Sequence, residues 1–257
     1  MSEGTPPGRL LLVANALDLG TQAVPLQDVL AHGVIAQAAH LRHWRVEDAR
    51  SARAFLNRVH RIAPLALALQ SLDIVELPRP LKGRPPAAGA GVPAPDLLAP
   101  ARSGADIGLL SEAGLPGVAD PGAVLVAAAH AEGIPVVALS GPSSLTLALA
   151  ASGLNGQSFA FLGYLPSEAE ARHVRLREIE GISRRLQQTQ MFIETPYRNG
   201  ALMEAALQAL QPTTRLAVSC GLTLPDGWSR CLTVAGWRHA RPVLPDRVPA
   251  VFALLAP

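Results

Sequence analysis

The chain of 257 residues has little cysteine, little charge and no long uninterrupted apolar run, and each shortage narrows the class of protein. Two cysteines, Cys220 and Cys231, are too few for a disulfide framework, and we expect them to be reduced and to face each other across a hairpin. Histidine and cysteine nowhere have metal-ligand spacing, so we expect no metal. Residues 123–139 are apolar but interrupted by charge, glycine and proline, so we expect no membrane span. The N-terminus lacks signal-peptide features, which favours a cytoplasmic protein.

The composition is that of a globular protein, with 49% hydrophobic and 16% charged residues. The length allows one large domain or two ordinary ones, each able to bury a core. A formal net charge of +2 is too small to indicate a nucleic-acid partner by itself. Function therefore has to be sought in motifs.

Strand-like apolar runs alternate with segments of helical spacing, which predicts an α/β fold with parallel βαβ units. We expect a first α/β domain over residues 1–155 and a second over 156–257. Expected strands are 9–14, 34–39, 72–77, 107–110, 135–139, 159–164, 191–194, 215–220 and 248–255, with a hairpin-like return at 231–235. Expected helices are 48–59, 123–132, 144–152, 167–186 and 199–210.

Residues 78–100 interrupt this alternation with seven prolines and three glycines in 23 residues. Such a segment is expected to form neither helix nor sheet. A mobile lid near the site and a family-specific disordered insertion are both compatible with it, and the insertion is the favoured interpretation.

The most informative stretch is 111–122, SEAGLPGVADPG, between an expected strand and an expected helix. A glycine-rich turn at the carboxyl end of a strand is where open α/β sheets bind ligands. Its spacing is neither GxGxxG nor GxxxxGK[ST], which excludes the dinucleotide and P-loop fingerprints.

This stretch resembles the S-D-A-G-T-P-x-x-x-D-P-G signature of the tetrapyrrole methylase superfamily, the class III S-adenosylmethionine (SAM) methyltransferases. Further motifs follow the same order and resemble the branch that methylates a ribose of small-subunit ribosomal RNA. They are VEDAR at 46–50 (A-E-D-T-R), GIPVV at 133–137 with SGPSS at 140–144 (G-I-P-V…P-G-P-S-A), SGL at 152–154 with FLGYLP at 161–166, and FIETPYR at 192–198 (F-Y-E-S-P-H-R). The resemblance covers roughly residues 9–235.

The resemblance implies two α/β domains with mostly parallel or mixed sheets, a SAM-binding cleft between them, and a homodimer. It implies a methyltransferase, with the ribose 2′-hydroxyl of ribosomal RNA as the acceptor. The positions assigned to SAM are Glu112, Ala113, Gly114, Pro116, Asp120, Gly141, Pro142, Ser143 and Ser144. The positions assigned to catalysis are Glu47, Asp48 and Arg50, with Asp18 as another candidate proton acceptor.

Several of these residues also have a structural interpretation. Asp120 before Pro121 is typical of a helix N-cap, as is Ser143 before an apolar helix. Residues 47–50 are equally typical of a solvated first helical turn, where acids are favoured by the helix dipole.

The chain departs from the ribosomal RNA branch in two places. Residues 14–20 (ANALDLG) stand where the branch has T-P-I-G-N, and residues 78–100 replace a His-Asn-Glu segment. Glu112 also replaces the usual aspartate. Two alternatives therefore accompany RNA methylation: a regulatory protein that binds SAM without catalysis, and a methyltransferase for a tetrapyrrole-like small molecule.

Overall fold

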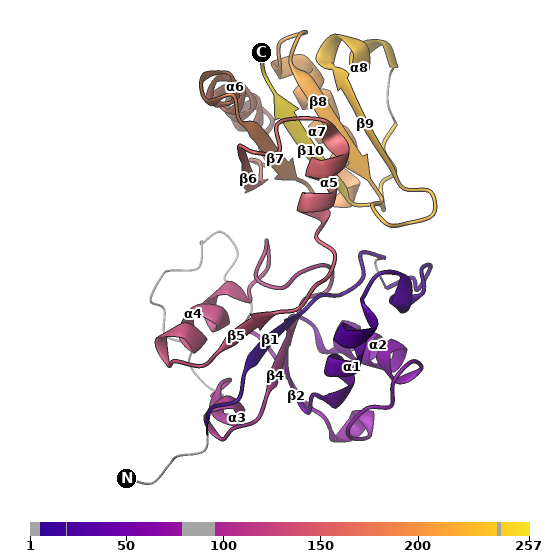
Figure 1. The fold of residues 1–257 in the computed structure, drawn as a ribbon. Coiled ribbons are helices and arrows are strands. Elements are labelled where there is room, and N and C mark those ends of the chain that lie inside the picture. Colours follow the sequence, from indigo (N-terminus) through magenta and orange to yellow (C-terminus); the bar gives the residue numbers. More distant parts are fainter. Residues whose placement is uncertain (1–5, 19, 79–95, 241–242) are drawn as a thin grey trace. The chain divides into compact units, whose positions relative to one another are not determined.

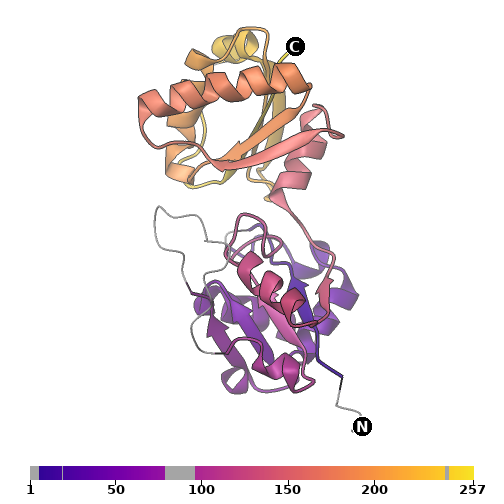
Figure 2. The ribbon, with the colours of Figure 1, turned by 90° about the vertical axis from the view of Figure 1, so that its left-hand side faces the viewer.

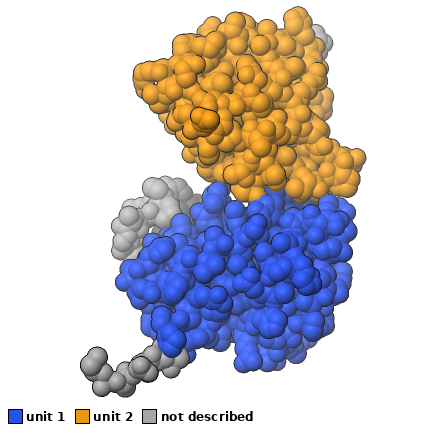
Figure 3. All heavy atoms as spheres, in the orientation of Figure 1, with its two compact units in different colours: residues 1–142 blue, residues 143–257 orange. Residues whose placement is uncertain are grey.

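The computed structural model describes residues 6–18, 20–78, 96–240 and 243–257, which form two compact α/β units (Figures 1 and 3). Unit 1 comprises residues 1–142 and unit 2 residues 143–257. The division falls before helix α5 (Ser144–Ser152), earlier than the expected division after residue 155, because α5 packs on three strands of unit 2.

Unit 1 contains a five-stranded parallel sheet with helices on both faces (Figure 1). The strand order is β3 (Asp73–Glu76), β2 (His43–Val46), β4 (Ile107–Leu110), β1 (Leu10–Val13) and β5 (Val136–Ala138). One face packs on α1 (His32–His40) and α2 (Ala49–His60), the other on α3 (Ala99–Arg102) and α4 (Ala123–Ala131), and two short 3-10 turns are η1 (Leu26–Asp28) and η2 (Leu69–Ser71). Leu10 and Leu11 belong to the two different cores, as the alternation of side chains along a strand requires.

Two expectations for unit 1 are wrong. Residues 34–39 form part of α1 and not a strand, because Val34, Ile35, Ala38 and Ala39 are buried along one helical face. The expected insertion largely lies outside the described residues, at 79–95. Its end is not irregular, however, since α3 begins at Ala99 with proline in its first turn, where the missing N–H costs nothing.

Unit 2 contains a mixed sheet of five strands (Figure 2). Its order is β6 (Phe159–Tyr164), β7 (Thr189–Ile193), β10 (Ala250–Leu255), β8 (Arg215–Cys220) and β9 (Trp228–Thr233), with only β6 and β7 parallel. Helix α5 covers one face, while the other packs on α6 (Ala169–Leu186), α7 (Asn199–Ala209) and α8 (Val234–Ala240), with η3 (Pro196–Arg198) before α7.

The hairpin formed by β8 and β9 corrects the cysteine expectation. Cys220 lies opposite Trp228 and Cys231 opposite Ala217, so the two thiols do not face each other, and both are free. The predicted return at 231–235 is β9 only as far as Thr233, after which the chain turns into α8 and buries Trp237.

The residues that the structure describes lack two further features. They include no helix with the length and apolarity needed to span a membrane. Among them, no three or more histidine, cysteine, aspartate or glutamate side chains are grouped so as to hold a metal ion.

Candidate functional site

The topology of unit 1 defines a crevice at the carboxyl edge of its sheet. The loop after β1 leads to the face covered by α1 and α2, whereas the loop after β4 leads to α4 on the other face. Adjacent strands whose loops diverge in this way form the switch point at which open α/β sheets bind ligands. The signature, residues 111–122, is the loop that leaves β4 at this point.

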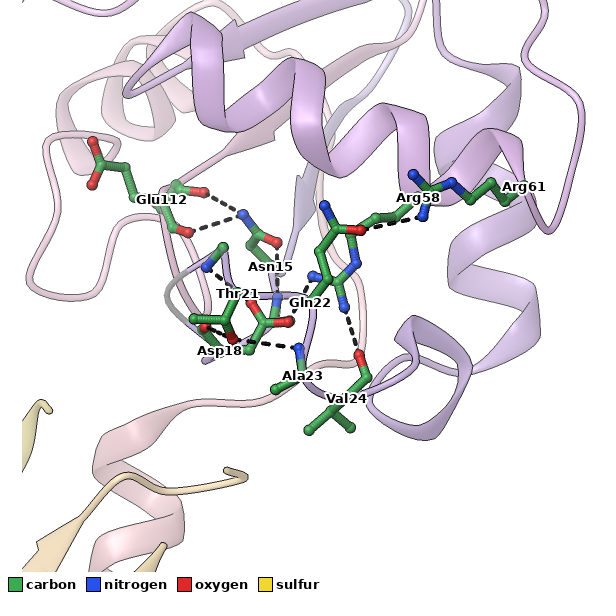
Figure 4. Close-up of polar contacts among 12 residues, drawn as sticks. Asn15, Asp18, Thr21, Gln22, Ala23, Val24, Arg58, Arg61 and Glu112 are labelled. Atoms are coloured by element: carbon green, nitrogen blue, oxygen red, sulfur yellow. Dashed lines mark hydrogen bonds and ion pairs between the residues drawn. The ribbon is translucent and has the colours of Figure 1, made fainter. Parts of the chain in front are cut away.

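Asn15 ties the two diverging loops together (Figure 4). Its backbone N–H donates to Gly114 O at 2.9 Å, and Gly114 N–H donates back to Asn15 O at 3.1 Å. The Asn15 amide also donates to Glu112 O at 2.9 Å and to Ser111 O at 3.3 Å. Asn15 thus holds the signature loop through both its own backbone and its side chain.

Gly114 is required at this bridge for conformational reasons. Its φ of +73° lies in the left-handed region, which glycine adopts without the steric penalty of a Cβ. A Cβ would also lie 3.3 Å from Leu17 Cδ2 and 3.5 Å from Pro142 O. A larger side chain here would therefore disturb the loop itself, as well as any ligand near it.

The loop after β5 approaches the loop after β1 just as closely. A Cβ on Gly141 would lie 2.2 Å from Ala14 Cβ, a distance that real side chains do not reach. Gly141 and Pro142 therefore lie beside the same bridge as Gly114.

Three carboxylates gather around the signature loop. Glu47 follows β2, and its Oε2 accepts a hydrogen bond from Glu112 N at 3.0 Å. Asp120 is partly buried; burial and the charges of Glu47 and Glu112 raise its pKa to about 6, against the opposing effect of a hydrogen bond with Ser111. The raised pKa reflects burial first and the negative charges of Glu47 and Glu112 second, and a bound cation would offset the second of these causes.

The three residues assigned to catalysis occupy different environments. Glu47 contacts the signature loop, as described above. Asp48 is the N-cap of α2, because its Oδ1 accepts from Ser51 N at 2.7 Å. The Arg50 side chain is exposed and makes no hydrogen bond or ion pair with any residue that the structure describes. The structure therefore brings Glu47, but not Arg50, into contact with the signature.

Neither helix cap expected from the sequence is formed by a side chain. Helix α4 begins at Ala123 with Gly122 as N-cap, so the interpretation of Asp120 as a cap is wrong. Ser143 occupies the N-cap position of α5, ahead of Ser144, but its hydroxyl makes no capping bond. Of the other assigned positions, Pro116 is buried and Ala113 half-buried in the signature loop.

The loop after β1 is held by a buried ion pair (Figure 4). Arg58 Nη1 on α2 lies 2.8 Å from Asp18 Oδ2, and the two side chains are only 8% and 3% exposed. Arg58 also donates to Val24 O at 2.8 Å, and Arg61, one turn later, donates to Gln22 Oε1 at 3.2 Å. Asp18, which the sequence offered as a candidate proton acceptor, is thus already paired with Arg58.

Beside this ion pair lies a cavity of about 210 Å³. Its walls include Asn15, Ser51, Phe55, Glu112 and Ala113, so it adjoins the signature loop. Sequence reasoning missed Asn15, Gln22 and Arg58. Asn15 carries a usable signal, because it follows directly on a strand, whereas nothing marks Arg58 among the other arginines of an amphipathic helix.

Comparison with known proteins adds to this geometry. The sequence profile described as Tetrapyrrole (Corrin/Porphyrin) Methylases matches residues 86–228. Two similar proteins are named ribosomal RNA small subunit methyltransferase I: one from Vibrio cholerae, 39% identical over 47% of this chain, and one from Mesorhizobium japonicum, 37% identical over 52%. The matches cover 41% and 44% of those relatives' own lengths, so the chain aligns with less than half of each.

Solved structures resemble the chain over nearly its whole length. A uroporphyrin-III C-methyltransferase from Thermus thermophilus aligns with 96% of this chain and 94% of its own, at a TM-score of 0.51 and 21% identity. A conserved hypothetical protein from Aeropyrum pernix aligns with 97% and 85%, at a TM-score of 0.56 and 17% identity. At these identities the likeness establishes the fold.

Proposed function

Because this chain belongs to the tetrapyrrole (corrin/porphyrin) methylase family, we propose that it transfers a methyl group from SAM to an acceptor. The observation that carries the proposal is the position of the signature loop, 111–122, at the switch point of the unit 1 sheet. The loop is anchored to its neighbour through Asn15 and is flanked by carboxylates.

The residues at this edge fit the cofactor in charge and in shape. SAM carries a sulfonium and an ammonium group, and the crowded carboxylates of Glu47, Glu112 and Asp120 favour a cation. The loops present glycine backbone, on which no Cβ blocks close approach. We assign cofactor binding to Glu112, Ala113, Gly114, Pro116, Asp120, Gly141 and Pro142, with Ser143 and Ser144 retained from the sequence motif.

When bound, SAM supplies a methyl group on a sulfonium, which a hydroxyl oxygen can attack. The chain must align that oxygen and receive its proton, and alignment is worth more than a strong base in such a displacement. Of the proposed catalytic residues, Glu47 is the best placed, because it contacts the signature loop directly. Asp48 and Arg50 complete the proposal through the motif that they share with it.

We propose the ribose 2′-hydroxyl of small-subunit ribosomal RNA as the acceptor. The support is the name shared by the two relatives, together with the ordered motifs of the sequence. A specific observation favours a second candidate, a SAM-binding protein without turnover: the loop after β1 is occupied by the Asp18–Arg58 ion pair where the branch has T-P-I-G-N.

Two measurements separate these candidates. Calorimetric titration with SAM should give one site per chain, and absence of binding would contradict both. Transfer of labelled methyl groups to small ribosomal subunits from a strain lacking this gene should label a ribose, with loss of label for Glu47→Gln and not for Arg53→Gln. Binding without transfer would favour the second candidate.

The family resemblance also leads us to propose a homodimer that acts in the cytoplasm. Light scattering coupled to size-exclusion chromatography should give twice the mass of the chain. A monomer at the concentration used for the transfer assay would refute the dimer without affecting the proposed chemistry.

A further inference from the structure

The amino-terminal edge of the unit 1 sheet, opposite the signature, contains a second and larger hollow. Its volume is about 680 Å³, within the range of roughly 300–1,000 Å³ typical of small-molecule sites. It lies between the last turn of α1 and the turn before β4. Buried Leu11 and Leu41 contribute its apolar part.

Two arginines and one aspartate at the starts of three strands give this side of the hollow a net positive charge. Arg9, Asp106 and Arg42 directly precede β1, β4 and β2, and the register aligns them with Asp106 in the middle. Arg9 takes both carboxylate oxygens, with Nη2 2.6 Å from Oδ2 and Nε 3.2 Å from Oδ1. Arg42 is exposed, and its side chain makes no hydrogen bond or ion pair with any described residue.

Two histidines line the same hollow with fixed orientations. His40 Nδ1 lies 2.7 Å from Ala36 O, and since a carbonyl only accepts, Nδ1 must carry the hydrogen. His43 Nδ1 lies 3.0 Å from Asp73 Oδ2, which fixes that ring in the same way. In neither ring does Nε2 bond to a described residue, so each ring has one nitrogen available to a ligand.

We infer that this hollow binds a nucleoside phosphate, either as a free nucleotide or as one unit of an RNA strand. The Arg42 guanidinium matches the geometry of phosphate oxygens and has no partner to displace among the residues that the structure describes. The imidazoles of His40 and His43 line the hollow, and imidazole rings are among the side chains on which bases stack. The RNA source rests on the proposed function; the nucleotide source does not.

The test uses the full chain and three probes: cytidine 5′-monophosphate, a short single-stranded RNA and inorganic phosphate. Arg42→Gln combined with His40→Gln should weaken binding of the nucleotide, the RNA or both by about tenfold, and reduce the salt dependence of RNA binding by about one unit of slope. Arg53→Gln is the matched control, because Arg53 is exposed on α2 and bonds only within its own helix.

Loss of RNA binding in the double variant, with or without loss of nucleotide binding, would assign the hollow to RNA, and loss of nucleotide binding alone would assign it to a free nucleotide. Equal affinity in the double variant, or inorganic phosphate binding as tightly as the nucleotide, would overturn the inference. SAM titration of the same variants should be unchanged. A chain that binds SAM but neither the nucleotide nor the RNA therefore refutes only this inference, and a chain that binds the nucleotide but not SAM refutes only the proposed function.

Discussion

Two loops leave neighbouring strands at the same edge of the unit 1 sheet and are stabilised in opposite ways. The loop after β4 is rich in glycine and is held mainly through its backbone, by Asn15 and Glu47. The loop after β1 is held by side chains, through the buried pair of Asp18 and Arg58. The family signature is in the first loop, and one of the departures from the ribosomal RNA branch, residues 14–20, is in the second.

The two loops differ in how far a short sequence motif can specify their structure. A backbone-held loop keeps its shape through positive φ angles and close approaches, which a short motif can encode. A loop held by an ion pair depends on a residue elsewhere in the chain. We therefore expect substitutions in α2 to reshape the cavity beside the signature without touching the motif.

The largest expected effect comes from breaking the ion pair. Arg58→Gln leaves the Asp18 carboxylate buried without its cation, which should lower the free energy of unfolding by about 3–5 kcal/mol. Urea denaturation of the full chain measures this change. Arg61→Gln is the control, because Arg61 is exposed and should cost about 0.5 kcal/mol or less. Equal losses for both variants would refute the special role of the buried pair.

The second effect concerns the close approach of the loops after β1 and β5. Gly141→Ala places a Cβ 2.2 Å from Ala14 Cβ and should cost about 1–3 kcal/mol. Ala14→Gly in the same chain removes the opposing atom and should recover part of the loss. Gly181→Ala in α6, where a Cβ meets nothing within 4 Å, should be neutral or stabilising. If Ala14→Gly does not restore stability, the loss in Gly141→Ala does not come from its contact with Ala14.

These two cases show what the sequence can and cannot predict. Strands 159–164 and 215–220 were predicted with the observed bounds, and the signature was placed correctly after β4, because alternation and glycine-rich turns are local signals. Residues 34–39 were predicted as a strand because a short apolar run fits either period.

Local sequence patterns could not predict contacts between residues that are far apart in the sequence. Asp18 and Arg58 are brought together only when α2 packs on the sheet, so no motif contains both. The offset of Cys220 and Cys231 is likewise set by the register of β8 and β9. The raised pKa of Asp120 arises from burial and from two carboxylates on separate segments. Each of these depends on tertiary structure.

A third prediction separates the two roles of Asp48. Asp48→Ala removes the cap of α2 and should cost about 1 kcal/mol, whereas Asp48→Asn retains an acceptor oxygen and should cost only a few tenths. Thermal denaturation gives both values. If Asp48 is also catalytic, Asp48→Asn should lose methyl transfer at nearly normal stability. Full activity of Asp48→Asn would leave capping as its role and remove it from the proposed catalytic set.

The last prediction is the pH dependence contributed by Asp120. Its pKa is raised from 3.8 to about 6 by burial and neighbouring carboxylates, so the folded state holds this proton more tightly than the unfolded state. Its contribution to stability is therefore fully present below about pH 4 and is lost as the pH rises through about 6. Asp120→Asn should flatten this part of the stability curve and gain stability relative to the parent chain at pH 7. Urea denaturation at pH 4 and pH 7 measures the difference, and parallel curves for the two proteins would contradict it. Because a cation beside the signature loop would relieve the same repulsion, saturating SAM should reduce the difference between the two proteins at pH 7.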